Sequence, residues 1–329
     1  MRVWIIGSGG LLGRGVEQVF AGQKKDSESA HFTTRLFSPP QIFDWSDSSK
    51  VTRQIDEACA EFFTQSKGEP WTVYWCAGRG TLHSPPNQMR DETIVFASFL
   101  KSVAKNCPDQ LLKIGTIFFA SSAGAVYEGS QEPPFTEFSA TRSLSSYGDA
   151  KIEQEELLKE FANRLQVRVL VGRIANLYGA RQDFSKSQGL IATICSSVLR
   201  RQPVNLFVPL QTSRNYVFID DAAKRIVRHA QQMSKSAVTE YFKIKLIVAS
   251  ENVTIGSILN IAKSVLRTRP LVVFSTPSNG AVQPQSLVFK SVVDTNLDNE
   301  TMTGFTVGMK KVMADLQHKF MVDGSVQNV

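Results

Sequence analysis

The sequence predicts an α/β fold, in which a doubly wound parallel sheet is joined by a smaller α/β lobe that binds substrate. Short apolar runs alternate with helix-like segments along residues 3–171, and this alternation is typical of a parallel sheet with crossover helices. A glycine-rich turn follows the first apolar run and opens the first helical segment. The expected strands are 3–6, 33–37, 71–77, 114–120 and 167–171. The expected helices are 13–20, 50–63, 94–103 and a helix that follows Tyr147.

The last third of the chain is less regular. We expect strands at 242–249 and 271–274 and helices at 254–266 and 307–320, with Thr254 as an N-cap for the first of these helices. Residues 1–179 are expected to form the dinucleotide-binding domain, with about 214–235 returning to it. Residues 180–329 would then form most of the substrate-binding lobe.

The bulk composition is that of an ordinary globular protein, with 329 residues of which 42% are hydrophobic and 20% charged. The first apolar run is too short for a signal-peptide core, and no later run approaches the ~20 residues that span a bilayer. The net charge of +7 is spread along the chain, without the basic and aromatic interleaving of nucleic-acid binders. We therefore expect no membrane span and no nucleic-acid partner.

The four cysteines and four histidines are scattered along the chain, without the paired spacing of metal ligands. No metal site is expected. Cys76 falls in a strand-like run and is expected to be a buried free thiol. Scattered free thiols fit a reducing compartment, so the expected location is the cytoplasm.

The glycine turn Gly7-Ser8-Gly9-Gly10-Leu11-Leu12-Gly13 separates the first strand from the first helix. Glycines at Gly7, Gly10 and Gly13 permit a tight turn, a close approach of backbone to a pyrophosphate, and close packing of helix on strand. The helix N-terminus, with Leu11 and Leu12, then faces the phosphates with its partial positive charge. This arrangement predicts a Rossmann-like dinucleotide site, against the alternative of a plain structural turn.

The cofactor's identity is left open by the second strand. No acidic residue follows Phe37 to bond a ribose 2′-hydroxyl, so both NAD and NADP remain candidates, with NADP slightly favoured. Asp44 could contact the adenine edge, or it could be a turn carboxylate. Ala77, at the end of the third expected strand, is a further candidate for the cofactor site because ligands bind beyond the carboxyl ends of such strands.

Tyr147 and Lys151 are four residues apart at the start of an expected helix, so their side chains share one helical face. A nearby ammonium favours the phenolate, and we expect it to lower the pKa of Tyr147 so that the phenol can exchange a proton. The alternative is a solvated surface pair. Ser121 and Ser122 follow the strand at 114–120, where a hydroxyl can bond a substrate oxygen; the alternative is a serine-rich turn.

These three elements occur in the order in which the extended short-chain dehydrogenase/reductase family has them, and the chain resembles the NAD-dependent epimerase/dehydratase group that acts on nucleotide sugars. The resemblance continues in Gly172-Arg173-Ile174-Ala175-Asn176-Leu177-Tyr178-Gly179 and in Arg214-Asn215-Tyr216-Val217-Phe218-Ile219-Asp220-Asp221. Glu251-Asn252-Val253-Thr254-Ile255 is similar to the start of a late family helix. The matching segments extend over essentially the whole chain.

The resemblance implies roles for the matching residues. Tyr147 would be the general acid/base, Lys151 would bind the nicotinamide ribose and lower the Tyr147 pKa, and Ser122 or Ser121 would polarise the reacting oxygen. A nicotinamide cofactor would carry the hydride. A possible homodimer is also implied. The substrate-binding candidates are Asn176, near a pyrophosphate, and Arg214, whose guanidinium fork matches phosphate oxygens unless it forms a surface ion pair.

The positions at which the sequence departs from the family pattern limit which of the family's reactions we expect. Ala123-Gly124-Ala125 stands where sugar dehydratases carry Thr-Asp-Glu, so an acid/base pair for removing water is missing. The family's asparagine near Thr93 is absent, Asn215 replaces an aspartate, and the loop 78–91 is divergent. The prediction is therefore a nucleotide-sugar epimerase or ketoreductase. The alternatives are a non-catalytic dinucleotide-binding sensor and a reductase of a non-nucleotide ketone.

Overall fold

The computed structural model describes residues 1–26, 34–182, 189–235, 240–275 and 286–322. The chain divides into two compact units. The first unit contains Met1–Ser130, Ser139–Ile174 and Ala223–Leu246, and the second contains Gln131–Phe138, Ala175–Ala222 and Ile247–Val329. The first unit is therefore built from three separate stretches of chain, and the helix that begins at Ile219 passes from the second unit into the first.

The first unit is organised around a six-stranded sheet with the order β2-β1-β3-β4-β5-β9. Its strands are β1 (Arg2–Ile6), β2 (Arg35–Phe37), β3 (Trp71–Trp75), β4 (Gly115–Ser122), β5 (Arg168–Ile174) and β9 (Phe242–Ile247). The pairings from β2 through β5 are all parallel. The predicted α/β fold class is confirmed.

The strand order reverses at β1, which has β2 on one side and β3 on the other. Loops that leave β1 and β3 therefore run in opposite directions and open a crevice at the carboxyl ends of these strands. In open α/β sheets this switch point is the usual place for a dinucleotide. The fold thus brings the glycine turn after β1 and Ala77 after β3 to the same edge.

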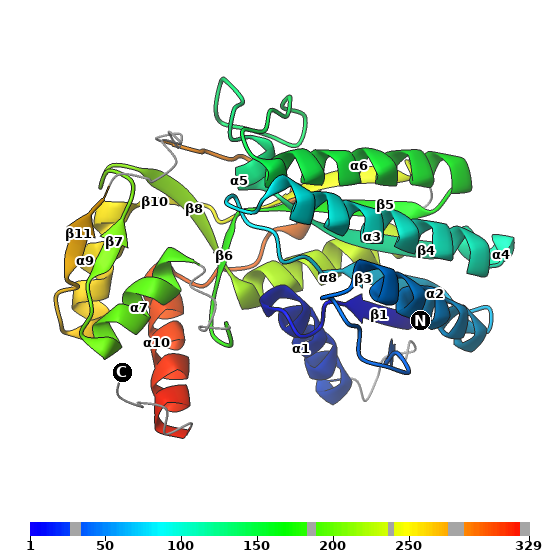
Figure 1. The fold of residues 1–329 in the computed structure, drawn as a ribbon, viewed down its shortest axis with the longest axis horizontal. Helices are drawn as coiled ribbons and strands as arrows, with labels where there is room; N and C mark the ends of the chain where they lie inside the picture. The colour runs from blue at the N-terminus through cyan, green and yellow to red at the C-terminus, as the bar shows by residue number, and fades with distance from the viewer. Residues whose placement is uncertain (27–33, 183–188, 236–239, 276–285, 323–329) are drawn as a thin grey trace. The chain divides into compact units, whose positions relative to one another are not determined.

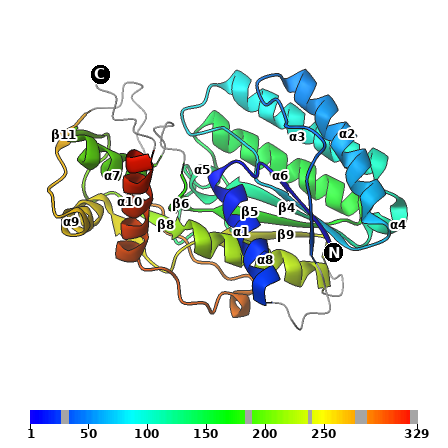
Figure 2. The ribbon, with the colours of Figure 1, turned by 90° about the horizontal axis from the view of Figure 1, so that it is seen from below.

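Helices cover both faces of this sheet. Figure 2 shows α2, α3 and α6 on one face and α1 and α8 on the other. The helices of the first unit are α1 (Leu11–Asp26), α2 (Ser48–Ser66), α3 (Pro86–Asn106), α4 (Asp109–Leu112), α5 (Ala123–Val126), α6 (Ser146–Leu165) and most of α8 (Ile219–Lys235). Because both faces are covered, the strands read as continuous apolar runs.

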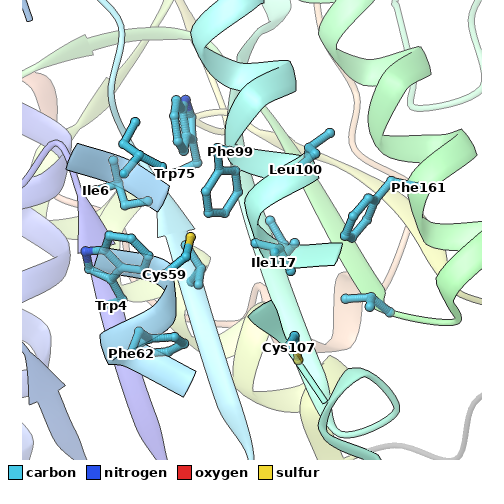
Figure 3. Close-up of a cluster of buried hydrophobic side chains, with 14 of the residues drawn as sticks. Trp4, Ile6, Cys59, Phe62, Trp75, Phe99, Leu100, Cys107, Ile117 and Phe161 are labelled. Carbon is cyan, nitrogen blue, oxygen red and sulfur yellow. The ribbon is translucent and has the colours of Figure 1, made fainter. Parts of the chain in front are cut away.

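The main core lies between the sheet and the helices α2, α3 and α6 (Figure 3). The rings of Trp4 and Phe62 have centroids 5.4 Å apart and both are fully buried. Aromatic pairs of this kind add to the large apolar area that each ring removes from water. Cys59 and Cys107 lie in the same core as free thiols, and burial raises the pKa of both, so neither is a reactive thiolate at neutral pH.

The described residues of the second unit form two small sheets and the helices α7, α9 and α10, together with the start of α8 (Figure 1). The three-stranded sheet has the order β10-β8-β6, and β11 pairs with β7 in parallel. The strands are β6 (Asn176–Tyr178), β7 (Val204–Leu206), β8 (Ser213–Phe218), β10 (Asn252–Thr254) and β11 (Val272–Phe274). The helices are α7 (Leu190–Arg200), α9 (Ile255–Leu266), α10 (Phe305–Val322) and the 3-10 turn η1 (Thr295–Leu297). The three α-helices pack against one another.

The predicted elements are present with shifted ends. Thr254 caps α9 as expected, accepting a hydrogen bond from the Ser257 amide at 3.1 Å. Helix α3 begins at Pro86, whereas the sequence analysis expected it to begin at residue 94. The first two turns are mostly polar, so they lack the apolar periodicity on which the prediction was based. Thr33, in the predicted second strand, lies outside the described residues. The sequence analysis missed the strands β6 and β8 and the helices α7 and α8.

Candidate active site

The glycine turn forms a tight cradle between β1 and α1. Gly7 has a φ of +88°, and a Cβ built there would stand 2.6 Å from the Ala77 amide nitrogen. A Cβ at Gly13 would overlap the Gly7 carbonyl oxygen. The Gly10 amide donates to that same oxygen at 3.0 Å. Gly7 and Gly13 have room for backbone alone, so the residues present fit a pyrophosphate held at a helix N-terminus.

The remaining candidates of the cofactor cradle lie at this same edge. Leu11 and Leu12 are the first residues of α1, and Leu12 is buried. Ala77 follows directly on the Cys76 amide, which donates to the Ile6 carbonyl at 2.8 Å and so continues the pairing of β3 with β1. The fold therefore places the turn after β1 beside the end of β3, as the switch point requires.

Asp44 sits in the turn that leads into α2. Its carboxylate accepts hydrogen bonds from the Ser46 amide at 3.2 Å and hydroxyl at 2.5 Å, and it pairs with Lys50 at 3.0 Å. The Ser46 and Lys50 bonds hold the pKa of Asp44 at about 2. These contacts are those of a turn carboxylate, and a contact with adenine stays a prediction. Asp47, which sequence reasoning did not select, is the N-cap of α2.

Ser122 and Tyr147 are brought together at the carboxyl end of β4. Ser122 is the last residue of β4 and caps the short helix α5, accepting a hydrogen bond from the Ala125 amide at 3.3 Å. Tyr147 lies in the first turn of α6, whose N-cap Ser145 accepts from the Gly148 amide at 3.2 Å. Ser122 lies close enough to the Tyr147 phenol for its hydroxyl to lower the pKa of that phenol. The two caps thus fix the two groups in a shared position.

Lys151 lies one turn further along α6, with only 5% of its surface exposed. Its ammonium donates to the Ala120 carbonyl at 3.1 Å and lies 4.6 Å from the centroid of the Phe119 ring. The Tyr147 ring centroid is 5.8 Å away. Burial lowers the pKa of Lys151 to about 8, although the charges of Glu92 and Glu155 oppose the shift. A substantial share of this lysine is therefore neutral at mildly alkaline pH.

The pKa of Tyr147 differs from the sequence-based expectation. Burial raises it to about 12, and the hydrogen bond from Ser122 only partly offsets the cost of forming a buried phenolate. The expected lowering by Lys151 was wrong, because desolvation of the phenolate, together with the nearby charge of Glu92, raises the pKa of Tyr147. Tyr147 is therefore protonated at neutral pH and is set to donate a proton.

Ser121 faces away from this pair, into a buried ionic cluster. Its hydroxyl donates to Glu155 at 2.5 Å, and Glu155 forms an ion pair with Arg173 at 2.6 Å. Arg173 also donates to the Tyr127 hydroxyl. Because side chains alternate along a strand, only one of the two adjacent serines can face Tyr147. Glu155 and Arg173 were missed as site residues; the signal was the position of Glu155 four residues after Lys151.

The two substrate candidates lie in the second unit. Asn176 is exposed and donates to the Asn215 carbonyl at 2.9 Å. Arg214 is half-buried on β8 and donates to the Ser213 carbonyl at 2.9 Å. The register pairs Asn176 with Tyr216, two residues from Arg214 along β8. Both candidates thus belong to one three-stranded sheet.

Within the described ranges, no group of three or more His, Cys, Asp or Glu residues could hold a metal ion. Over that same part of the chain, no helix is long and apolar enough to cross a membrane. All four cysteines are free thiols, three of them buried and Cys76 half-buried.

The model of one protein family matches residues 3–244, which is most of the chain. That family is described as the NAD-dependent epimerase/dehydratase family. The chain belongs to it. The match includes the glycine turn, Ser121-Ser122 and the Tyr147–Lys151 pair, so the resemblance inferred from these residues is confirmed at the level of the family. The family description names NAD and gives no support to the slight preference for NADP.

Curated relatives match the chain only in part. The dTDP-4-dehydro-6-deoxyglucose reductase of Escherichia coli is 26% identical over 161 residues, covering 49% of this chain and 49% of that protein. The UDP-glucose 4-epimerase of Mycolicibacterium smegmatis is 28% identical over 119 residues, covering 36% of this chain and 38% of its own. The chain thus spans about half or less of the length of these relatives.

Solved structures resemble the chain over nearly its full length. The UDP-glucose 4-epimerase of Thermotoga maritima, solved with UDP-glucose, has a TM-score of 0.76 at 20% identity and covers 97% of this chain and 100% of its own. The UDP-glucose 4-epimerase of Thermus thermophilus, solved with NAD, has a TM-score of 0.74 at 18% identity, covering 96% and 99%. At these identities the likeness shows the fold.

Proposed function

We propose that the protein is an NAD-dependent enzyme that epimerises or reduces a nucleotide sugar, with Ser122, Tyr147 and Lys151 as its proton-transfer centre. One observation carries this proposal. Ser122 at the end of β4 and Tyr147 with Lys151 in the first turns of α6 gather at the carboxyl edge of the sheet that also holds the glycine cradle. The family membership and the NAD complexes among similar structures support it.

Each residue of the proposed proton-transfer centre has a separate role. When bound, NAD would supply or accept the hydride. Tyr147 donates its proton to the sugar oxygen as negative charge develops there, and Ser122 supplies a second hydrogen bond to that oxygen. Lys151 carries positive charge next to the phenol and would bind the ribose hydroxyls of the cofactor.

The protonation state of Tyr147 favours the reductive direction. A phenol whose pKa is about 12 is protonated at neutral pH, so proton donation to a ketone needs no prior ionisation. Epimerisation begins instead with removal of a hydroxyl proton, for which Tyr147 must first lose its own proton. Dehydration is disfavoured, because Ala123 and Ala125 are buried apolar residues without acid or base groups.

The nucleotide part of the substrate is proposed to contact the second unit. Arg214 would pair with a diphosphate through its guanidinium fork, and Asn176 would donate to the same group through its exposed amide. The nucleotide-sugar complex of the Thermotoga maritima enzyme supports this class of substrate. The homodimer implied by the family resemblance stays a prediction, which sedimentation analysis tests.

The test is turnover by Tyr147→Phe, measured with UDP-sugars for epimerisation and with a keto-sugar nucleotide for NADH or NADPH consumption. Loss of a general acid lowers turnover by about 10²–10⁴-fold. The cofactor dissociation constant, measured by calorimetry, should stay unchanged because the phenol does not contact the glycine cradle. Full turnover by the variant contradicts the proposal. Cofactor binding without any turnover by the unmodified protein favours the sensor alternative.

Mass spectrometry of the purified protein separates the two proposed reactions. NAD that is retained through purification indicates an epimerase, because such an enzyme regenerates its cofactor in each turnover. A protein that releases its cofactor and consumes NADH or NADPH with a keto-sugar nucleotide is a reductase. If it reduces only ketones without a nucleotide, the proposed roles of Arg214 and Asn176 are wrong.

A further inference from the structure

Glu92 connects the loop that follows β3 to the proton-transfer centre of the first unit. It lies on α3, next to Thr93, in the region where the sequence departs from the family pattern. Its carboxylate oxygen Oε1 accepts a hydrogen bond from the Arg79 amide at 2.8 Å. This hydrogen bond holds the middle residue of the loop segment 78–80 against α3.

This loop segment packs directly against Tyr147. A Cβ built at Gly80 would stand 2.8 Å from the Tyr147 ring carbon Cδ2 and 2.6 Å from the Met89 methyl carbon. Gly78 has a φ of +148°, which side-chain-bearing residues rarely adopt. The backbone of the loop therefore forms one wall around the phenol, and the bond from Glu92 holds that wall in place.

The second carboxylate oxygen of Glu92 faces Lys151. A Cβ built at Gly78 would stand 3.5 Å from Glu92 Oε2 and 4.0 Å from Lys151 Nζ. The carboxylate and the ammonium thus both lie close to the backbone at Gly78. At this range the two charges attract each other without forming a contact ion pair.

Glu92 is the unbalanced negative charge near Lys151. Glu155, the other carboxylate that acts on Lys151, is paired with Arg173 at 2.6 Å. Among the residues that the structure describes, no cation lies within ion-pair distance of Glu92. Phe119 and Ala120 of β4 present a ring and a carbonyl to the ammonium, and neither is charged.

We propose that Glu92 is a positioning residue of the reaction, which anchors the loop 78–80 against Tyr147 and supplies the negative charge that balances Lys151. The inference rests on the proposed function and deepens it. The pKa directions agree, because Glu92 raises the pKa of both Tyr147 and Lys151. Both groups are then kept in the protonated form that donation to a ketone requires.

Two substitutions separate the anchor from the charge. Glu92→Gln keeps an oxygen acceptor for the Arg79 amide and removes only the charge, whereas Glu92→Ala removes both. In Glu92→Gln the pKa of Lys151, followed by NMR of its side chain and assigned with Lys151→Arg, should fall by about one unit. The high-pH limb of the reduction rate should move to lower pH in the same variant. Glu92→Ala should show the same shift and a further loss of turnover.

Asp91→Asn is the matched control, because Asp91 is an exposed carboxylate adjacent to Glu92 on α3. It should leave the Lys151 titration unchanged. A Lys151 pKa in Glu92→Gln equal to that of the unmodified protein overturns the inference, whatever the turnover. The titration does not depend on turnover, so a shifted Lys151 pKa in a protein that neither epimerises nor reduces a nucleotide sugar supports the charge role of Glu92 and contradicts the proposed function instead.

Discussion

The two units hold their candidate polar residues in different ways. In the first unit, Tyr147, Lys151 and Ser122 are fixed by side chains and carbonyls from several elements, with a buried Glu155–Arg173 ion pair beneath them. In the second unit, Asn176 and Arg214 donate to backbone carbonyls of their own sheet and remain partly open to solvent. The first arrangement suits chemistry, which needs fixed geometry, and the second suits recognition of a charged group.

This difference has an energetic consequence. A buried charge that loses its partner keeps its full desolvation cost, so the site of the first unit is coupled to the stability of that unit. A partly exposed arginine is hydrated with or without its ligand. Substitutions should therefore affect folding in the first unit and binding in the second.

The largest effect is expected for Glu155→Gln. It leaves Arg173 buried beside a neutral amide, and breaking a buried pair in this way costs about 3–5 kcal/mol of unfolding free energy. Urea denaturation of the variant and the unmodified protein measures the difference. The double variant Glu155→Met with Arg173→Met removes both charges and should recover most of the loss. Equal stability of Glu155→Gln and the unmodified protein would break the contrast between the units.

The two adjacent serines sharpen the contrast within the first unit. Ser122→Ala removes a hydrogen-bond donor at the reacting oxygen and should lower turnover by about 10²-fold or more. Ser121→Ala should retain turnover within a few-fold and instead lose about 1 kcal/mol of stability, because it deletes one bond to Glu155. Steady-state kinetics and urea denaturation of both variants distinguish the two roles. If Ser121→Ala loses more turnover than Ser122→Ala, then Ser121 rather than Ser122 supplies the catalytic hydroxyl.

Arg214→Ala tests the second unit. Loss of a charge-assisted bond to a diphosphate should raise the KM for a nucleotide sugar by about 10–100-fold with kcat nearly unchanged. The unfolding free energy should change little, because the side chain is only half-buried. Arg214→Lys keeps the charge but lacks the planar fork, so its KM should lie between those of the unmodified protein and Arg214→Ala. A fall in kcat at constant KM would place Arg214 at the reacting centre.

The smallest effect is expected for Asp44, whose carboxylate is exposed to solvent and bonded within its own turn. Its pKa is lowered to about 2 by Ser46 and Lys50, so its contribution to stability is present above its ordinary value near 4 and is lost as pH falls towards 2. The difference in unfolding free energy between the unmodified protein and Asp44→Asn should therefore shrink over that interval. A difference that grows with acid would contradict the sign of this shift. A change in the NAD dissociation constant of this variant would instead support the adenine contact.

Much of the first unit was predictable because its signals are local. Residues 3–20 determine a strand, a glycine turn and a helix N-terminus. The positions that require glycine, Gly7 and Gly13, also lie within this short segment. The strands were predicted because sheets covered on both faces require continuous apolar runs. Strand β6 was missed because a strand of three residues carries little periodic signal. Strand β8 and the helices α7 and α8 are long enough to show a pattern, and the sequence analysis overlooked them.

The sequence by itself determined the order of the motifs, the α/β fold and the shared helical face of Tyr147 and Lys151. The tertiary structure was needed to show which serine faces the phenol, in which direction the pKa of Tyr147 moves, and that the charges of Glu92 and Glu155 act on Lys151. The reason is physical: spacing along a helix fixes which side chains are neighbours, whereas desolvation and charge balance depend on groups from distant segments. Burial by the loop 78–80 and by β4 cannot be read from the five residues that contain the Tyr–Lys pair.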